Sequence, residues 1–213
     1  MVESTVSMTP KPSQNDFKVI IVGGSISGLT LAHALDRAGI SHIVLEKGKN
    51  ITFDGGASIS LQPNGLRILD QLGLYQDIFK TTKPMSQSIW RNADGKVVRK
   101  SRFMQMVEER HGYPILCFER SELLDILYRR YQKKENVFTS CEVVKVESGR
   151  DGVVVMTKNG SVFKGDIVVG ADGINSAVRR HLWDIERARD PDAAKRMEAC
   201  EFAIRLTRGS VRY

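Results

Sequence analysis

Three short segments of the chain carry groups suited to binding a dinucleotide. Residues 23–28 read GGSISG, and Gly23 and Gly28 are the small residues that let a backbone approach a pyrophosphate. Glu46 follows about 20 residues later, the spacing at which an acid accepts hydrogen bonds from an adenosine ribose. Asp172 lies in GADG, directly after an apolar run. The pattern predicts a dinucleotide site, and Glu46 favours an unphosphorylated ribose, as in FAD or NAD.

The first segment departs from the G-x-G-x-x-G pattern at its middle position, where Ser25 replaces glycine. The small serine side chain leaves room for a ligand, and its hydroxyl can donate to a phosphate oxygen. A glycine-rich turn in any parallel α/β protein is the competing interpretation. The context favours a dinucleotide site, because a strand precedes the turn, a helix follows it, and an acid comes at the required distance.

The elements around these segments are predicted from hydrophobic patterns. Residues 18–22 (KVIIV), 42–45 and 167–169 are unbroken apolar runs, typical of buried parallel strands. Residues 29–38 place apolar side chains at helical spacing. A β-strand, an α-helix and a second strand therefore follow one another, and Asp172 is expected at the carboxyl end of a further strand, where α/β sheets bind ligands.

The remaining pattern alternates short helices and strands. We expect a short helix ending at Gly73, a hairpin, and a helix capped by Ser121 with an apolar stripe over residues 123–128 that ends near residues 133–134. A series of short strands follows this helix. The predicted strands and hairpin arms are 88–91, 96–98, 114–118, 137–139, 143–146, 153–156 and 161–163.

Composition excludes several other classes of protein. The three cysteines are far apart and show no metal-ligand spacing, so we predict no metal site. The formal net charge is +7, but the basic residues are dispersed without interleaved aromatics, so we expect no nucleic-acid partner. The sequence has no apolar stretch of the roughly 18 residues that a membrane span needs. Residues 1–16 are predicted to be a flexible leader and not a secretory signal, and we expect a cytoplasmic protein.

These segments together resemble the flavoprotein monooxygenases of the para-hydroxybenzoate-hydroxylase fold, in particular the paxilline-type branch of fungal secondary metabolism. The matching segments are residues 20–33, 44–47, 56–59, 63–65, 118–120 and 166–179. The resemblance implies a glutathione-reductase-type FAD-binding Rossmann domain, an α/β fold with an inserted β-meander, over residues 17–183. It also implies that Glu46 holds the adenosine ribose, that Arg120 and the backbone at Ser60 lie near FAD, and that Asp172 supports both FAD and the approach of NAD(P)H.

Two departures from the family bear on function. Its members are much longer and carry a second Gly-Asp motif followed by His and Pro, whereas residues 165–166 are the single Gly-Asp pair here. The family also usually has glycine at the position of Ser60. Residues 184–213 diverge from the family, and one interpretation is that they begin a truncated substrate domain that is largely missing.

The function implied by the resemblance is that of an FAD-dependent monooxygenase using NAD(P)H and O₂ on a prenylated or terpenoid small molecule. Two alternatives remain open: a truncated, non-catalytic remnant that at most binds a dinucleotide, and an NAD-linked dehydrogenase. The dehydrogenase is disfavoured because residues 166–179 follow a flavoprotein pattern and the sequence has no Tyr-x-x-x-Lys pair. No catalytic side chain is assigned, and the four histidines are expected to be structural.

Overall fold

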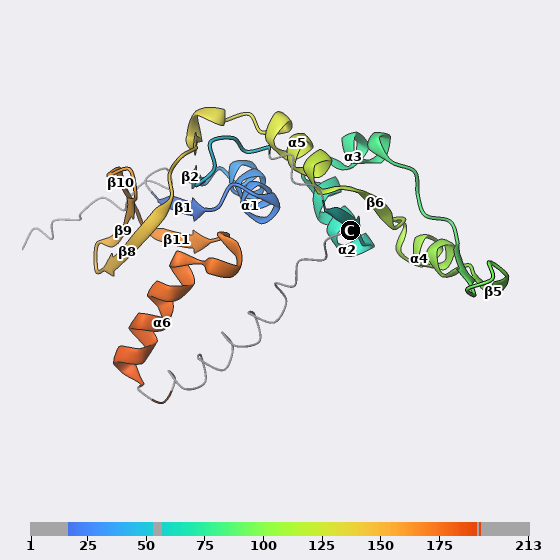
Figure 1. Cartoon of the computed structure of the whole chain (residues 1–213). Helices are drawn as coiled ribbons and strands as arrows, with labels where there is room; N and C mark the ends of the chain where they lie inside the picture. The colour runs from blue at the N-terminus through green and yellow to red at the C-terminus, as the bar shows by residue number, and fades with distance from the viewer. Residues whose placement is uncertain (1–16, 53–56, 191, 193–213) are drawn as a thin grey trace, which may run out of the picture.

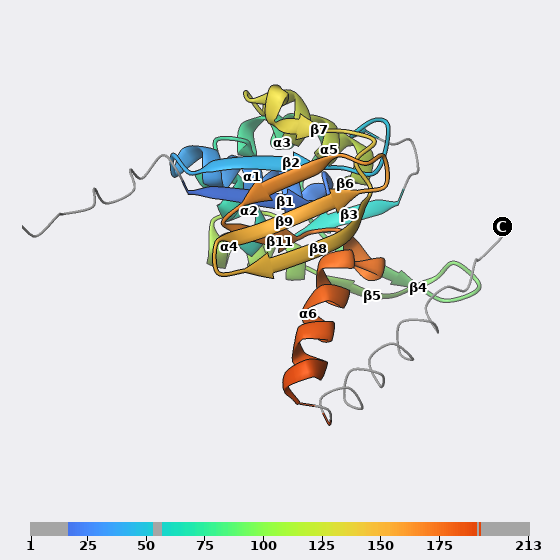
Figure 2. The ribbon, with the colours of Figure 1, turned by 90° about the vertical axis from the view of Figure 1, so that its left-hand side faces the viewer.

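A four-stranded parallel sheet forms the centre of the computed structural model, which describes residues 17–52, 57–190 and 192. Its strand order is β11-β1-β2-β7. Helices cover one face of this sheet and an antiparallel meander covers the other (Figures 1 and 2). The strands are β1 (Lys18–Val22), β2 (Ser41–Leu45), β7 (Val137–Phe138) and β11 (Ile167–Gly170).

Strand β1 is buried on both faces because its apolar run alternates between the two layers. Val19 and Ile21 pack against α1 (Ile26–Arg37) and the end of α5 (Arg120–Arg130). Ile20 and Val22 contact the meander. Burial on both sides explains why the sequence shows an unbroken apolar run and not an alternating one.

The meander consists of β8 (Val143–Gly149), β9 (Gly152–Thr157) and β10 (Val162–Gly165), paired in the order β10-β9-β8. Its apolar face packs against the parallel sheet, together with the first turn of α6 (Ala177–Arg189). The α/β fold with an inserted β-meander, predicted from the sequence, is confirmed.

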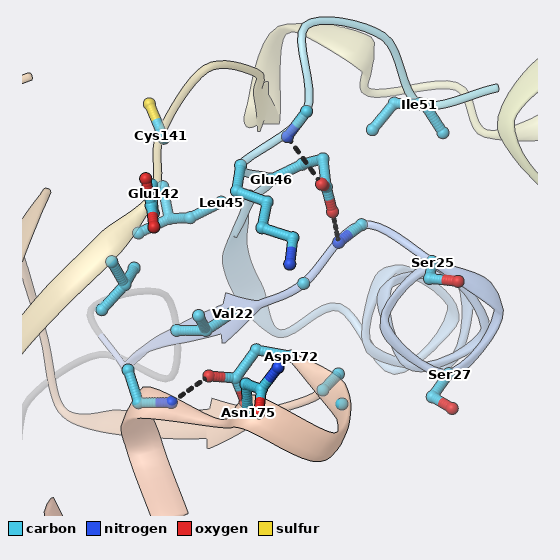
Figure 3. A pocket seen from close by; sticks show the side chains of 18 of the residues that line it. Val22, Ser25, Ser27, Leu45, Glu46, Ile51, Cys141, Glu142, Asp172 and Asn175 are labelled. Atoms are coloured by element: carbon cyan, nitrogen blue, oxygen red, sulfur yellow. Dashed lines mark hydrogen bonds between the residues drawn. The ribbon is translucent and has the colours of Figure 1, made fainter. Parts of the chain in front are cut away.

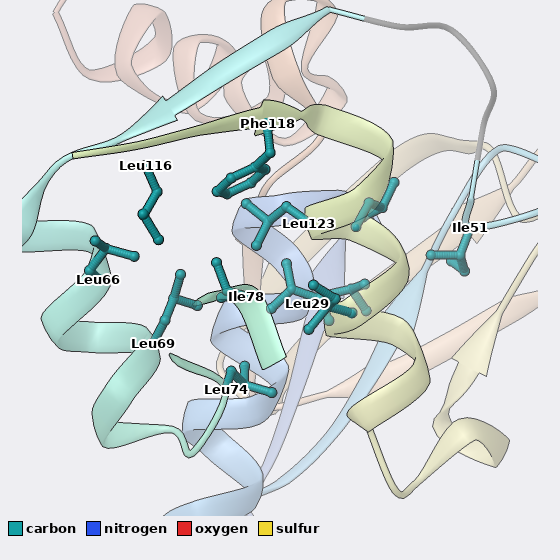
Figure 4. Packing of buried hydrophobic residues seen from close by; sticks show 12 residues of the cluster. Leu29, Ile51, Leu66, Leu69, Leu74, Ile78, Leu116, Phe118 and Leu123 are labelled. Carbon is teal, nitrogen blue, oxygen red and sulfur yellow. The ribbon is translucent and has the colours of Figure 1, made fainter. Parts of the chain in front are cut away.

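A second hydrophobic core packs helix α1 against elements from the middle of the chain. Strands β3 (Ser58–Leu61) and β6 (Leu116–Glu119) pair antiparallel. Beside them lie α2 (Pro63–Gln71) and α3 (Tyr75–Thr81), and their buried apolar side chains, Leu66, Leu69 and Ile78, pack in one core with α5 and α1 (Figure 4). Two short 3₁₀ turns, η1 (Lys134–Asn136) and η2 (Gly173–Asn175), complete the described elements.

The hairpin of β4 (Ser88–Arg91) and β5 (Val97–Ser101) and the following helix α4 (Phe103–His111) lie at the opposite end of the molecule from the meander (Figure 1). We call residues 88–111 the hairpin–helix unit. Every residue of its two strands and its helix is exposed or half-buried. The hairpin itself was predicted, and the structure confirms it.

The start of α5 differs from the prediction. Its N-cap is Glu119 and not Ser121, and the helix ends at Arg130, before the lysines at 133 and 134. Glu119 and Glu122 form a capping box, in which each side chain accepts from the other residue's backbone N–H. This reciprocal pair satisfies two exposed donors at once, which a single serine hydroxyl cannot do.

Further sequence predictions concern the two ends of the chain, a metal site and a membrane span. The predicted leader, residues 1–16, and most of the 184–213 segment lie outside the described residues. Within the described part of the chain, no three His, Cys, Asp or Glu side chains are grouped as metal ligands would be. None of the helices described is both long and apolar enough to cross a membrane.

Candidate cofactor site

Strand register brings three separate loops to one edge of the parallel sheet. Val22, the last residue of β1, is level with Leu45 of β2 and with Gly170 of β11. The chain leaves each strand at that level, and the Gly23 N–H donates to the Leu45 carbonyl oxygen over 2.8 Å. We call the loop residues 23–25, 46–48 and 171–175 the nucleotide edge. It is the carboxyl edge of the sheet, where α/β proteins bind ligands.

A cavity of about 1060 Å³ lies along the nucleotide edge (Figure 3). Small-molecule pockets are typically about 300–1,000 Å³ in volume. The cavity therefore has room for a group the size of a dinucleotide. All three loops line it, and α5, residues 49–52 and the segment between β7 and β8 complete its wall.

Two glycines give the first loop its shape. Gly23 has a φ of +109°, and an added Cβ there would collide with the backbone of Ala171. A Cβ on Gly28 would collide with the carbonyl oxygen of Gly23. Gly23 thus permits the turn beside the β11 loop, whereas Gly28 permits α1 to pack closely against the end of β1.

Glu46 joins two of the loops through its carboxylate. One carboxylate oxygen accepts from the Gly24 N–H and the other from the Gly48 N–H, each over 2.7 Å (Figure 3). Each oxygen of a carboxylate has two acceptor positions. Glu46 can therefore hold the glycine-rich loop in place and still accept a hydrogen bond from a ligand hydroxyl in the cavity.

Ser25 and Arg120 meet although 95 residues separate them. Arg120 begins α5, and its guanidinium donates to the hydroxyl oxygen of Ser25, the N-cap residue of α1. Because the hydroxyl accepts from Arg120, its own proton is available to a ligand. A cation, a hydroxyl donor and a helix N-terminus therefore come together, which is a favourable site for a phosphate group.

Asp172 fixes the third loop. One of its carboxylate oxygens accepts from the Ala177 N–H over 2.6 Å, and the other is buried without a hydrogen-bond partner among the described residues. Arg179 donates to the carbonyl oxygens of Gly173 and Ile174, and its guanidinium lies over the Trp183 ring. The unpaired acceptor is one that a bound hydroxyl or water can satisfy.

The charge balance of the cavity wall favours an anion. Its cationic side chains outnumber its acidic ones, and one of the acids, Glu142, is paired with Lys158 at 3.2 Å. A diphosphate carries the negative charge that this wall would attract. The cations are Lys47, Lys49, Arg120 and Arg180, and the acids are Glu46, Glu142 and Asp172.

The structure brings together five of the seven residues that were predicted to bind the cofactor. The cavity is lined by Gly23, Ser25, Glu46, Arg120 and Asp172. Gly28 lies beneath the loop and acts through packing. Ser60 is an exposed residue of β3, level with Cys117 of β6, and it is not among the residues that line the cavity. Its approach to the flavin stays a prediction.

The segment between β7 and β8 was missed by sequence reasoning. Cys141 and Glu142 line the cavity, and the Cys141 N–H donates to the Glu46 carbonyl oxygen over 2.8 Å. Residues 137–139 were predicted as a strand, and β7 forms at Val137–Phe138, but its parallel pairing with β2 was not predicted. That pairing delivers the following residues to the cavity, and the sequence pattern carries no signal for it.

In a comparison with models of protein families, residues 16–197 match the FAD binding domain family. The chain belongs to this family. The cofactor predicted from the sequence is therefore confirmed as FAD. The cavity wall fits this cofactor in two respects, because it has dinucleotide size and offers cationic and hydroxyl donors to a diphosphate.

Curated relatives are FAD-dependent monooxygenases of fungi. The FAD-dependent monooxygenase nodM of Hypoxylon pulicicidum is 50% identical over 90% of this chain, and the match covers 42% of that protein. The FAD-dependent monooxygenase atmM of Aspergillus flavus is 42% identical over 89% of this chain, covering 41% of its own length. The chain thus spans about two fifths of the length of these relatives.

Solved structures agree with this assignment. HpxO of Klebsiella pneumoniae, complexed with FAD and uric acid, is 31% identical with a TM-score of 0.71, over 78% of this chain and 42% of that one. The 2,6-dihydroxypyridine-3-hydroxylase of Arthrobacter nicotinovorans is 26% identical with a TM-score of 0.65, over 80% of this chain and 40% of that one. The matched region is thus about two fifths of these enzymes too.

Proposed function

We propose that the chain is the FAD-binding part of an FAD-dependent monooxygenase of fungal secondary metabolism, which uses NAD(P)H and acts on a prenylated or terpenoid small molecule. One observation carries the proposal. The glycine-rich loop, Glu46 and the Asp172 loop line one cavity, in a chain that is 50% identical to a fungal FAD-dependent monooxygenase. The names of the fungal relatives support the reaction class, and the NAD(P)H and substrate classes rest on the family resemblance.

Each loop of the nucleotide edge receives a role in this proposal. The diphosphate of FAD lies against the N-terminus of α1, where the Ser25 hydroxyl and the Arg120 guanidinium donate to it. Glu46 accepts from the adenosine ribose. The loop at Asp172 closes the other side of the cavity, and its unpaired carboxylate oxygen accepts from a hydroxyl of the cofactor.

Bound FAD would supply the redox chemistry: with two electrons from NAD(P)H, one oxygen atom of O₂ would enter the substrate and the other would leave as water. The chain's own contribution is to bind and orient this group. The Glu46 carboxylate keeps Gly24 and Gly48 in place, so the wall is formed before the cofactor arrives. A preformed wall lowers the ordering cost of binding.

The test measures the affinity of the purified 213-residue chain for FAD, ADP and adenosine by calorimetric titration. We expect FAD and ADP to bind, and adenosine to bind more weakly because it lacks the diphosphate. Replacing Arg120 with Leu should remove most of the advantage of ADP over adenosine. Equal affinities for ADP and adenosine in the unaltered chain would contradict the phosphate roles of Ser25 and Arg120.

A second candidate function is a non-catalytic FAD-binding remnant, favoured by the match to only 42% of nodM. NADPH oxidation by the chain with bound FAD, measured with and without prenylated aromatic or terpenoid compounds, separates the two. Substrate-dependent oxidation with an oxygenated product supports the enzyme. FAD binding without oxidation supports the remnant.

Retention of FAD is a further measure of how much of the binding cleft the chain supplies. We expect the chain to retain FAD poorly in gel filtration, because a tight site buries most of its ligand and these residues lack the family's second Gly-Asp motif. A monodisperse yellow monomer with one FAD per chain would show that the 213 residues suffice.

A further inference from the structure

Three elements that begin or end at the cavity also meet at their opposite ends. Helix α1 starts after Ser25, helix α5 starts at Arg120, and β2 leads into Glu46. Both helices run away from the nucleotide edge and β2 runs towards it, so the far halves of α1 and α5 lie near the start of β2. Three side chains from these elements meet there, and we call them the far-end cluster: His33, His42 and Tyr131.

His33 links α1 to the last turn of α5. Its Nε2 lies 2.9 Å from the Leu127 carbonyl oxygen. A carbonyl oxygen can only accept, so this ring nitrogen carries the proton and donates. In a continuing helix the Leu127 oxygen would accept from the Tyr131 N–H, but that N–H donates to the Tyr128 carbonyl oxygen instead. His33 therefore satisfies an acceptor that the end of α5 leaves free.

Tyr131 joins β2 to the same place. Its ring meets the His33 ring edge to face, with the centroids 5.3 Å apart. Its hydroxyl oxygen lies 2.6 Å from Nε2 of His42, whose Nδ1 lies 2.8 Å from the Ile40 carbonyl oxygen. Because that carbonyl can only accept, Nδ1 donates to it, and Nε2 of the neutral ring accepts from the Tyr131 hydroxyl. A series of directed contacts thus connects α1, the end of α5 and β2.

These polar contacts restrict how α1 and α5 lie against each other. Between the two ends, Leu29 of α1 packs in one core with Leu123 of α5 (Figure 4), but the hydrophobic effect is non-directional. A hydrogen bond restricts both the distance and the angle between its partners. The link from His33 to Leu127 lies eight residues along α1 and seven along α5, or about 10–12 Å from the nucleotide edge at 1.5 Å per residue. If the link were lost, a slide of one helix along the other would change the geometry at the cavity by the same distance.

We propose that the far-end cluster is a positioning unit for the cofactor. Through α1, α5 and β2 it sets the distances between the residues that these elements bring to the cavity. His33 acts on the diphosphate, because it joins the two helices whose first turns face it. Tyr131 acts on the adenosine ribose through β2, which leads into Glu46. None of the three cluster residues lines the cavity, and the proposal rests on the phosphate and ribose roles proposed above.

The experiment measures the affinity of the 213-residue chain and its variants for ADP and for adenosine by calorimetric titration. In His33→Leu the preference for ADP should fall about fivefold or more, because a displaced Arg120 makes weaker charge-assisted hydrogen bonds to the diphosphate. His33→Gln should restore the preference, because its side-chain N–H takes the place of Nε2–H and can donate to the Leu127 carbonyl oxygen. An unchanged preference in His33→Leu, or one that His33→Gln does not restore, would overturn the proposal.

Two reference variants separate positioning from other effects. Val155→Ala removes part of a fully buried side chain of β9, so it should lower stability in urea and leave the preference for ADP unchanged. A loss of preference in Val155→Ala as large as in His33→Leu would overturn the proposal. If Arg120→Leu abolishes the preference while His33→Leu keeps it, the phosphate site stands and the positioning role alone is refuted.

Tyr131→Phe covers the case in which His33→Leu does not fold. This variant keeps the ring beside His33 and removes only the hydroxyl that contacts His42. We expect its affinity for adenosine to fall about threefold, because β2 then holds Glu46 less firmly against the ribose. The ratio of the ADP and adenosine affinities should stay the same. An affinity for adenosine equal to that of the unaltered chain would overturn the proposal.

Discussion

The nucleotide edge and the hairpin–helix unit differ in what holds them in place. Strand β1, which leads into the nucleotide edge, has four of its five residues buried. A hydrogen bond of Glu46 joins two of the loops at this edge, and one of Asp172 holds the third loop to the start of α6. Every residue of β4, β5 and α4 is exposed or half-buried. The described chain thus provides the packing for one region and lacks it for the other.

The two regions therefore differ in the contacts that stabilise them. The cavity is bounded by elements whose apolar faces are already covered, so its wall can form within this chain. The side chains of the hairpin–helix unit have no comparable burial among the described residues. Substitutions in the first region should therefore affect folding or FAD affinity, and those in the second should leave both nearly unchanged.

The largest contrast is expected between two phenylalanines. Phe118 is buried in the core beside α5, and Phe118→Ala should lower the free energy of unfolding by about 3–5 kcal/mol because it leaves a cavity. Phe103→Ala in the hairpin–helix unit should change it by less than about 0.5 kcal/mol. Urea unfolding followed by circular dichroism measures both. Equal losses would show that the hairpin–helix unit has a packed core of its own.

A glycine pair tests the packing below the nucleotide edge. Gly28→Ala should destabilise the chain by about 3 kcal/mol, because its Cβ would collide with the Gly23 carbonyl oxygen. Gly65, also in a helix, has only an ordinary contact at 3.6 Å from its would-be Cβ. Gly65→Ala should stabilise by about 0.5–1 kcal/mol through helix propensity. Thermal unfolding of both variants decides, and a neutral Gly28→Ala would contradict the close approach.

Removing the Glu46 carboxylate should weaken FAD binding by about 1.5–3 kcal/mol, the usual worth of a hydrogen bond to a charged group. Calorimetric titration of Glu46→Ala measures this loss. The control is Glu147→Ala, an exposed acid of β8 that pairs with Lys145 outside the cavity. Glu147→Ala should keep its affinity, and unchanged affinity in Glu46→Ala would place the adenosine elsewhere.

The smallest expected effect concerns a buried hydrogen bond under the helical layer. The His42 ring lies between the Ile40 carbonyl oxygen and the Tyr131 hydroxyl, 2.6 Å from the latter, and both side chains are buried. Tyr131→Phe leaves the ring nitrogen of His42 without this partner and should cost about 1–2 kcal/mol near neutral pH. Urea unfolding at pH 7 measures the cost.

The same residue predicts a pH dependence. Burial, and secondarily the charge of Asp36, raises the pKa of Tyr131 from 10.0 to about 12. In the unfolded chain the phenol loses its proton first, so this contribution to stability is present below pH 10 and is lost between pH 10 and about 12. The difference between wild type and Tyr131→Phe should therefore narrow over this range. A difference that stayed constant would contradict the shift.

Much of the fold could be predicted because its central strands are short apolar runs. The runs at 18–22 and 42–45 each became a buried parallel strand. The run at 167–169 became a parallel strand, but its residues are half-buried or exposed because it lies at the edge of the sheet. The turn at Asn159 and Gly160 joined two meander strands. Pairing between distant strands was less accessible. The two-residue strand β7 is too short to show a pattern that distinguishes parallel pairing from a loop.

The site residues could be predicted where they come just after a predicted strand. Gly23 and Glu46 follow a strand directly and Asp172 comes two residues after one, so the pattern placed them at the sheet edge. The contact between Ser25 and Arg120 depends on how α5 crosses the sheet, which local sequence does not determine. The predicted N-cap of α5 at Ser121 was wrong, because Glu119 is the N-cap and forms a capping box with Glu122.

The pairing of β1 with β11 has a consequence for the order in which the protein is made. The Lys18 N–H donates to the Asp166 carboxylate over 2.6 Å, across 148 residues of sequence. On the ribosome, β1, α1 and β2 emerge first, and β1 must wait for its second neighbour until the whole meander has been synthesised. The loop that carries Asp172 thus arrives after the other two loops of the nucleotide edge. A nascent chain shorter than about 175 residues has the glycine-rich loop and Glu46, but it cannot yet enclose a cofactor.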